Sequence, residues 1–96
     1  MKSLVLFSVV SVMSFPVLAD DLHEIKTKSE QLGLISIEEA KSIALEAKPG
    51  IIDDIDLENR AFFGGWDYEM EVLGKDGKEW DIYINAETGE VRKVSR

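Results

Sequence analysis

Residues 66–84, WDYEMEVLGKDGKEWDIYI, decide the fold of this chain. On both sides of the Lys-Asp-Gly turn at 75–77, apolar residues alternate with acidic ones, and this period of two predicts two half-buried strands joined as a hairpin. A three-residue loop with Gly77 in the left-handed conformation would pair Val72 with Trp80. A two-residue loop would set the apolar face of one strand against the polar face of the other, so the pattern predicts the three-residue loop.

The segment before this hairpin has the pattern of an amphipathic helix at 37–48. Ser36 stands three residues before Glu39, the capping-box arrangement that satisfies free N–H groups at the start of a helix. Pro49 and the glycine after it end the helix. Its apolar positions recur at helical spacing, at Ile37, Ala40, Ile43, Ala44 and Ala47. The small alanines predict that this helix packs closely on a sheet.

Two more strands complete the pattern. One lies around Ile55 and Leu57, whose neighbours are acidic, and a short last strand runs from Glu90 to about Val94. Val91 and Val94 cannot both face inward without a bulge, and the sequence leaves this point open. The predicted fold class is α+β, with one amphipathic helix packed on a curled antiparallel sheet of three to four strands and a short N-terminal helix as an option. The sheet is expected to be apolar inside and acidic outside.

Residues 1–19 have the pattern of a cleavable signal peptide. Lys2 supplies the positive charge, residues 4–12 form the apolar region, and Pro16 breaks it before a cleavage site after Ala19. The alternative is a membrane anchor, but the stretch is shorter than the ~20 apolar residues that cross a bilayer and it contains serines. We therefore predict a bacterial periplasmic or secreted protein that is not inserted in the membrane after cleavage.

The processed chain is expected to be small and acidic. Loss of the 19-residue signal leaves 77 of 96 residues, and loss of Lys2 takes the formal net charge from −8 to −9. This charge repels phosphate backbones and anionic lipids, so neither nucleic acid nor a membrane surface is an expected partner. Without cysteine, no disulfide stabilises the domain. Residues 20–34 are either a short helix that ends near Gly33 or a disordered lead-in.

Residues 35–95 resemble the PepSY domain family, whose members include propeptides of thermolysin-type metallopeptidases and small stand-alone exported proteins. The matching segments are ISIEEA at 35–40, KPG at 48–50, YEMEV at 68–72, DGKEW at 76–80 and INAETGEV at 84–91. The resemblance implies a PepSY-like domain at 35–96 that is not an enzyme and that inhibits or regulates a peptidase or binds another envelope protein. No peptidase follows in the sequence, so we expect it to act in trans.

The residues themselves also argue against catalysis. There is no cysteine nucleophile, and His23 is the only histidine, in the uncertain segment before the helix. A Ser–His–acid triad needs a histidine held beside a serine, and nothing in the sequence predicts that arrangement. We expect His23 to be a solvated surface residue, with no catalytic residue, no metal site and no cofactor.

The candidate partner-binding residues lie in NRAFFGGW at 59–66, between two predicted strands. Two adjacent phenylalanines are unexpected in a connection of this kind, which usually lies on the surface. Either they fold back to lengthen the strands or cap the open end of the core, the favoured alternative, or they form an exposed aromatic tip that anchors an interface. The candidates are Arg60, Phe62, Phe63 and Trp66, with an exposed sheet edge as a further way to contact a partner.

A second hypothesis is cation or small-ligand binding by Asp54, Asp56 and Glu58. The run from Asp53 to Glu58 fails the EF-hand pattern, because Asn59 stands where that loop needs glycine. Its alternation favours the outward face of a solvated strand that resists aggregation. A third hypothesis is a structural or sensory accessory protein without a ligand of its own.

Overall fold

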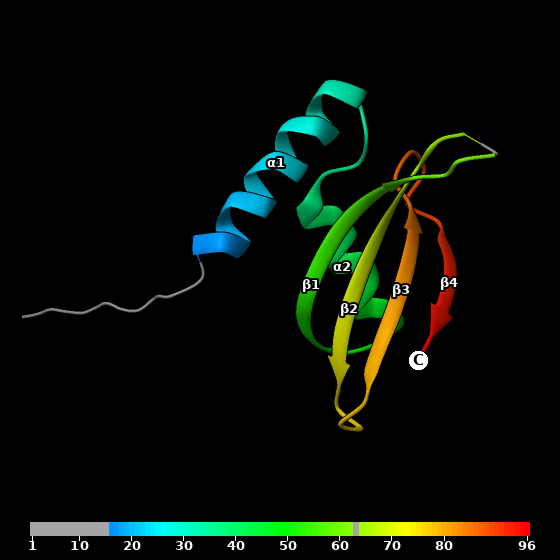
Figure 1. Cartoon of the computed structure of the whole chain (residues 1–96). Coiled ribbons are helices and arrows are strands. Elements are labelled where there is room, and N and C mark those ends of the chain that lie inside the picture. The colour runs from blue at the N-terminus through cyan, green and yellow to red at the C-terminus, as the bar shows by residue number, and fades with distance from the viewer. Residues whose placement is uncertain (1–15, 63) are drawn as a thin grey trace, which may run out of the picture.

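The computed structural model describes residues 16–62 and 64–96, which form two helices and a four-stranded antiparallel sheet (Figure 1). The elements in chain order are α1 (Pro16–Leu32), α2 (Ile37–Ala47), β1 (Gly50–Asn59), β2 (Trp66–Gly74), β3 (Glu79–Asn85) and β4 (Val91–Ser95). The sheet has the strand order β1-β2-β3-β4 and is not closed into a barrel. The predicted α+β class is confirmed, with α1 as the N-terminal helix.

Helix α2 begins at the predicted residue and ends at Ala47, one residue before the predicted end, with Lys48 as its C-cap. Ser36 is its N-cap, and its hydroxyl oxygen accepts a 3.0 Å hydrogen bond from the Glu39 N–H. The Lys48 N–H donates to the Ala44 carbonyl at 2.9 Å, and Pro49 then prevents continuation. The buried face carries Ile37, Ala40 and Ala44. Ala47, the last residue of the helix, is exposed although its spacing placed it on the apolar face.

The central hairpin has the predicted register. Val72 lies opposite Trp80, and further along Tyr68 lies opposite Ile84. The Gly74 N–H donates to the Lys78 carbonyl at 2.8 Å, so the loop contains three residues. Gly77 has φ +80°, the left-handed conformation expected for a bulged turn. The prediction made from the alternation of apolar and acidic residues is confirmed.

A bulge in β4 answers the question about the last strand. Tyr83 lies opposite Lys93 while Ile84 lies opposite Val91, so Arg92 is the extra residue. The bulge places Val91 and Val94 opposite inward-facing residues of β3. Their side chains are nevertheless 37% and 43% exposed, because β4 is an edge strand.

The core lies between α2 and the inner face of the sheet. Its largest fully buried side chains come from β2 and β3 and are Tyr68, Met70, Val72, Ile82 and Ile84. The Tyr68 hydroxyl donates a 2.7 Å hydrogen bond to the Ile35 carbonyl, so the one polar atom of this buried ring has a partner. Ile35 lies in the connection between α1 and α2. Its N–H donates to the Ala86 carbonyl at 2.9 Å, so this connection is held against the turn after β3.

Helix α1 answers the question about residues 20–34. They are helical up to Leu32, and Gly33, with φ +70°, follows the end of the helix. Leu22 and Ile25 pack against the core, and Ser29 is buried. The predicted cleavage point after Ala19 falls inside α1, and residues 1–15 of the predicted signal lie outside the described residues. Among the described helices, none has both the length and the hydropathy needed to cross a membrane.

Candidate functional site

Residues 60–65, which we call the tip loop, connect β1 and β2 and are folded around Arg60. The Arg60 N–H donates to the Gly65 carbonyl at 2.9 Å, and the Gly64 N–H donates to the Arg60 carbonyl at 3.0 Å. The guanidinium donates from Nε to the Gly64 carbonyl and from Nη1 to the Trp66 carbonyl, both at 3.0 Å. Gly65 has φ +85°, and a Cβ there would collide with the guanidinium. The base of the loop therefore has a defined conformation.

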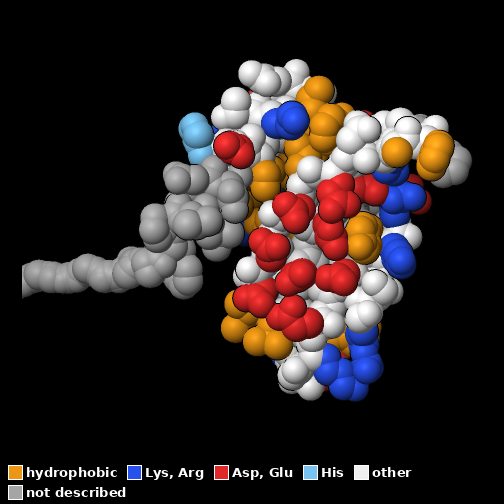
Figure 2. Space-filling view, viewed as in Figure 1, with side chains coloured by type: hydrophobic (Ala, Val, Ile, Leu, Met, Phe, Trp, Pro, Cys, Tyr) orange, Lys and Arg blue, Asp and Glu red, His pale blue; other side chains and the backbone are white. Residues whose placement is uncertain are grey.

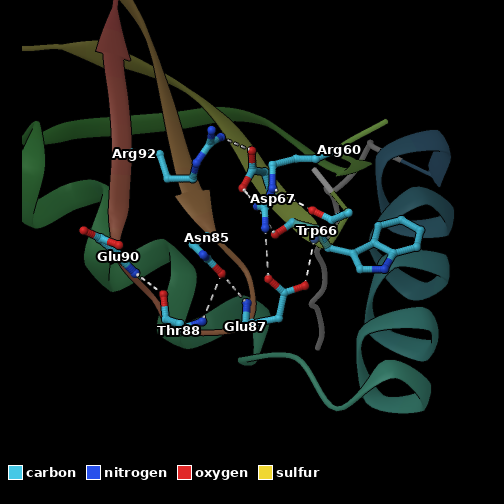
Figure 3. A network of polar contacts seen from close by, with 9 residues as sticks. Arg60, Trp66, Asp67, Asn85, Glu87, Thr88, Glu90 and Arg92 are labelled. Atoms are coloured by element: carbon cyan, nitrogen blue, oxygen red, sulfur yellow. Dashed lines mark hydrogen bonds and ion pairs between the residues drawn. The ribbon is translucent and has the colours of Figure 1, made fainter. Parts of the chain in front are cut away.

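Glu87 attaches the tip loop to the turn after β3 (Figure 3). Its carboxylate accepts from Arg60 Nη2 at 3.2 Å and from the Trp66 N–H at 2.8 Å. The turn is itself held by the Asn85 side-chain oxygen, which accepts from the N–H groups of Glu87 and Thr88 at 2.8 and 3.1 Å. Two connections far apart in the sequence thus form one polar network at this end of the sheet.

Asp67 is the buried centre of this network, and its position corrects the expectation from alternation. That pattern placed Asp67 on the solvated outer face, but its side chain is only 6% exposed. It is paired with Arg60 Nη1 on one side and with Arg92 Nη1, 2.5 Å away, on the other. The bulge in β4 brings Arg92 to this side of the sheet. A carboxylate can be buried here because two guanidinium groups replace the water that it loses.

Phe62 projects from the tip loop into solvent, with 95% of its side chain exposed. The alternative in which the phenylalanines cap the core is therefore wrong for Phe62, because the hydrogen bonds of Arg60 turn this part of the loop away from the sheet. Phe63 lies outside the described residues. Trp66 is half-buried, and its ring contacts Lys28 of α1, whose Nζ lies 5.1 Å from the ring centroid.

Carboxylates cover the outer face of the sheet over β1, β2 and β3, as Figure 2 shows. The register sets Asp54 beside Glu71 and Asp56 beside Glu69. Two groups of three carboxylates lie with their oxygens within 4.8 Å of one another, namely Asp53, Glu71 and Glu79, and Asp56, Glu58 and Glu69. Of the predicted cation-binding trio, Asp56 and Glu58 thus share a group with Glu69, and Asp54 lies beside the other group. Oxygen ligands of this kind suit Ca²⁺ or Mg²⁺.

The crowding of these carboxylates raises the pKa of several groups on the outer face. A hydrogen bond to Asp53, together with partial burial and repulsion from neighbouring carboxylates, raises the pKa of Glu79 to about 7. A hydrogen bond with Glu69, followed by partial burial, also raises the pKa of Glu58. The Tyr83 hydroxyl donates to Glu69 Oε2 at 2.9 Å, and this bond is the main reason that the pKa of Tyr83 rises to about 12. The acidic face thus holds protons more tightly than isolated carboxylates do.

The structure unites some of the candidate residues and adds others. Arg60 and the backbone of Trp66 belong to one network, from which Phe62 projects. Sequence reasoning missed Asp67, Glu87 and Arg92. The pairing of β2 with β3 was available and sets Asp67 opposite Asn85, but only the bulge in β4 brings Arg92 to the carboxylate. His23 is exposed on α1, as expected.

Comparison with known families gives one match, which covers residues 34–95. The matching family is PepSY, described as the peptidase propeptide and YPEB domain. The match includes α2, all four strands and the tip loop, and it leaves out α1.

Two relatives from Bacillus subtilis (strain 168) align with most of this chain. The uncharacterized membrane protein YkoI is 38% identical over 71 residues, which are 74% of this chain and 30% of YkoI. The uncharacterized protein YkoJ is 36% identical over 69 residues, 72% of this chain and 39% of YkoJ. The chain therefore spans well under half of the length of these relatives. No solved structure matches the chain.

Proposed function

The chain belongs to the PepSY family, and on that premise we propose that it is a non-catalytic binding module of the bacterial envelope, periplasmic or secreted, that restrains a partner protein in trans. A peptidase is the expected class of partner, because the matching family is named for peptidase propeptides. The signal peptide at 1–19 would deliver the chain to that compartment. The observation that carries the proposal is the exposure of Phe62 on a loop whose base is held by hydrogen bonds of Arg60.

An exposed aromatic ring on a preorganised loop is a good anchor for an interface. A phenylalanine that is 95% exposed gains nothing in the folded monomer, and burial in a partner would remove its apolar surface from water. Because Arg60 and Glu87 already hold the base of the loop, binding would cost less conformational entropy than for a loop that must be ordered. The polar groups around the base would form the rim of the interface.

Capture from envelope extracts tests this proposal. The processed chain, immobilised and exposed to an envelope extract of its own organism, should retain a protein that Phe62→Ser retains at least ~10-fold less, the loss expected of an anchor residue. Leu73→Ser is the matched control, since Leu73 is also an exposed apolar residue, 39% exposed at the other end of β2. If both variants retain the same proteins as the parent, the tip loop is not the binding site.

Inhibition assays then test the expected class of partner. Envelope peptidases of the same organism, assayed with increasing amounts of the processed chain, should include one that is inhibited by the parent and much less by Phe62→Ser. A captured partner without peptidase activity would keep the binding module and overturn the peptidase assignment.

A second candidate function, cation binding by the outer face, is favoured by the two groups of three carboxylates within 4.8 Å. Calorimetric titration with Ca²⁺ and Mg²⁺, compared between the parent and Glu69→Gln, tests it. Binding at micromolar concentration that is lost in the variant would support a site. Millimolar binding that salt suppresses would be screening of the net charge.

A further inference from the structure

A groove runs between α1 and β1 and is separate from the tip loop. It encloses ≈640 Å³ and is lined from β1 by Asp56 and Leu57. From α1 it is lined by the polar or charged side chains of His23, Glu24, Thr27, Lys28 and Gln31 and by the apolar Ile25. Figure 2 shows hydrophobic side chains between α1 and the acidic face, on the side where this groove lies.

The floor of the groove is the outer edge of the sheet. β1 is ten residues long and pairs with β2 on one side, and in the described part of the chain no strand pairs with its other side. An edge of this kind presents backbone N–H and C=O groups to any extended segment that reaches it. Ile55 and Leu57 face the inner side, whereas Asp54 and Glu58 face the outer side. From Asp54 to Glu58, after the irregularity between Ile52 and Asp54, the edge therefore alternates between an apolar face and an acidic face.

Residues that lie opposite one another on β1, β2, β3 and β4 form rows across the outer face, and these rows end differently at the β4 edge and at the β1 edge. The row that begins at Asp56 continues through Glu69 and Tyr83 and ends at Lys93 of β4, whose Nζ lies 5.6 Å from the centroid of the Tyr83 ring. In the next row Arg92 of β4 pairs with Asp67. Cationic side chains thus end these two rows at β4, while the row of Asp54, Glu71 and Asp81 ends at Ser95; at β1 all three rows end in carboxylates.

We propose that an extended segment of a partner protein adds to β1 as a fifth strand inside this groove, and that lysine or arginine alternates with apolar residues in that segment. The basic residues would lie on the outer face beside Asp54 and Glu58, and the apolar residues would lie on the inner face beside Ile55 and Leu57. This inference rests on the proposed function as a binding module and names the second contact and its chemistry.

The same carboxylates also protect the edge. Acidic residues on an edge strand repel acidic strands, and this includes β1 of another copy of the chain, so they limit self-association. The same carboxylates attract a basic strand and repel an acidic one, so they both limit self-association through β1 and select a basic partner segment. Helix α1 adds a steric limit, because the segment must fit as a single strand beneath it.

Synthetic peptides provide the first test. The probes are the alternating peptide KVKVKVK, a peptide of the same composition with its lysines and valines in separate blocks, and the acidic peptide EVEVEVE. In heteronuclear NMR titrations of the processed chain, KVKVKVK should shift and protect from exchange the amides of β1, and it should bind at least ~10-fold more tightly than the other two, as for a strand with several favourable cross-strand pairs. Equal affinity for the block peptide would overturn the proposal in favour of unspecific attraction.

A matched pair of charge reversals locates the site. Asp54→Lys and Asp81→Lys make the same change in one row of the outer face, on the edge strand and on the inner strand β3. Asp54→Lys should weaken binding of KVKVKVK about fivefold and strengthen that of EVEVEVE, whereas Asp81→Lys should change both less than twofold, because only a directly opposed charge is strongly coupled. Equal effects of the two variants would contradict addition to β1.

A neutral variant tests the groove without changing charge. Thr27→Trp should fill the space beside β1 and abolish peptide binding, while Ser42→Trp, on the exposed side of α2, should leave it unchanged. Sedimentation of the parent without peptide tests another occupant, the basic β4 of a second copy. If the parent chain self-associates and Asp54→Lys does not, the occupant of the groove is β4 of a second copy and not a segment of a partner protein, and the proposal is overturned.

These results are separable from those on the tip loop. Phe62→Ser should bind KVKVKVK like the parent, because Phe62 is outside the groove. A partner captured through Phe62 with no peptide binding at β1 would overturn this inference and leave the proposed function intact. Peptide binding at β1 without any Phe62-dependent capture would overturn the proposed function of the tip loop and leave this inference intact.

Discussion

The carboxylates on the outer face of the sheet lie in two opposite electrostatic environments. At the tip-loop end, Asp67 is buried between Arg60 and Arg92, so each charge has an opposite neighbour. Elsewhere on the face, carboxylates neighbour carboxylates, as in the pairs of Glu58 with Glu69 and of Asp53 with Glu79. The two regions lie on the same strands, yet one stabilises the fold through its charges and the other is destabilised by them at neutral pH.

This difference separates a structural region from a region that is open to partners. Buried charges must be paired, and the paired groups at the tip-loop end fix the conformation of the loop that presents Phe62. Like charges on an exposed face are tolerated because water screens them, and they keep the chain soluble and attract cationic groups. We expect the paired charges at the tip-loop end to stabilise the fold, and the like charges on the rest of the outer face to act in association with partners.

The largest test of this contrast is the removal of the buried carboxylate. Asp67→Ala should lower the free energy of unfolding by ~3 kcal/mol, because Arg60, whose side chain is 19% exposed, loses a partner in a poorly solvated place and the more exposed Arg92 loses its partner as well. Urea unfolding followed by circular dichroism measures this change. Asp81→Ala, in the middle of the same face, is the control and should be neutral or slightly stabilising. Equal destabilisation by both would mean that the two regions do not differ.

A second test compares the two arginines of the network. Arg60→Ala should cost ~2 kcal/mol, because the 19%-exposed Arg60 side chain also holds the carbonyls of Gly64 and Trp66. Arg92→Ala should cost ~1 kcal/mol or less, because its side chain is 42% exposed and screened by solvent. Hydrogen exchange at Gly64 and Gly65 should accelerate in the first variant and remain unchanged in the second. The reverse order would show that the bulged strand, rather than the loop, depends on Asp67.

The third test is the pH dependence of stability. Because the pKa of Glu79 rises from 4.5 to about 7 on folding, the folded chain binds more protons than the unfolded chain between these values. Stability should therefore be highest near the lower end of this window and fall as pH rises through it. We expect the melting temperature to be a few degrees higher at about pH 5 than at about pH 8 at low salt, with the difference shrinking as salt is added.

Glu79→Gln checks the origin of that change. It should raise the melting temperature at about pH 8 and flatten the profile, because the repulsion with Asp53 and Glu71 is removed. Glu90→Gln, in the turn before β4, is the matched control and should leave the slope unchanged. A profile that keeps its full slope in Glu79→Gln would place the titrating group elsewhere.

The sequence predicts the parts of the structure that depend on local periodicity. The pairing of Val72 with Trp80 and the cap at Ser36 follow from alternation and from hydrogen bonding within a few residues. The register of the hairpin follows because a shift by one residue would expose a whole apolar face, and α2 follows from apolar residues at helical spacing.

The candidate site was less predictable because it depends on contacts between distant segments. Alternation assigned Asp67 to solvent, and its burial needs Arg60, 7 residues earlier, and Arg92, 25 residues later. The spacing of Val91 and Val94 left a bulge in β4 open, but nothing local predicted that the bulge brings Arg92 to Asp67. The exposure of Phe62 likewise follows from the hydrogen bonds of the Arg60 guanidinium and not from hydrophobicity, which favoured a capping role.

The smallest expected effect on stability belongs to the residue with the largest expected effect on binding. Phe62→Ser should change the free energy of unfolding by no more than ~0.5 kcal/mol, because a fully solvated ring makes few contacts that folding could lose. The same variant should reduce partner capture at least ~10-fold, as for an interface anchor. Parallel urea unfolding and capture from envelope extract measure both quantities. A loss of more than ~1 kcal/mol would mean that Phe62 packs on the fold in solution, and the contrast between a structural base and an open tip would fail.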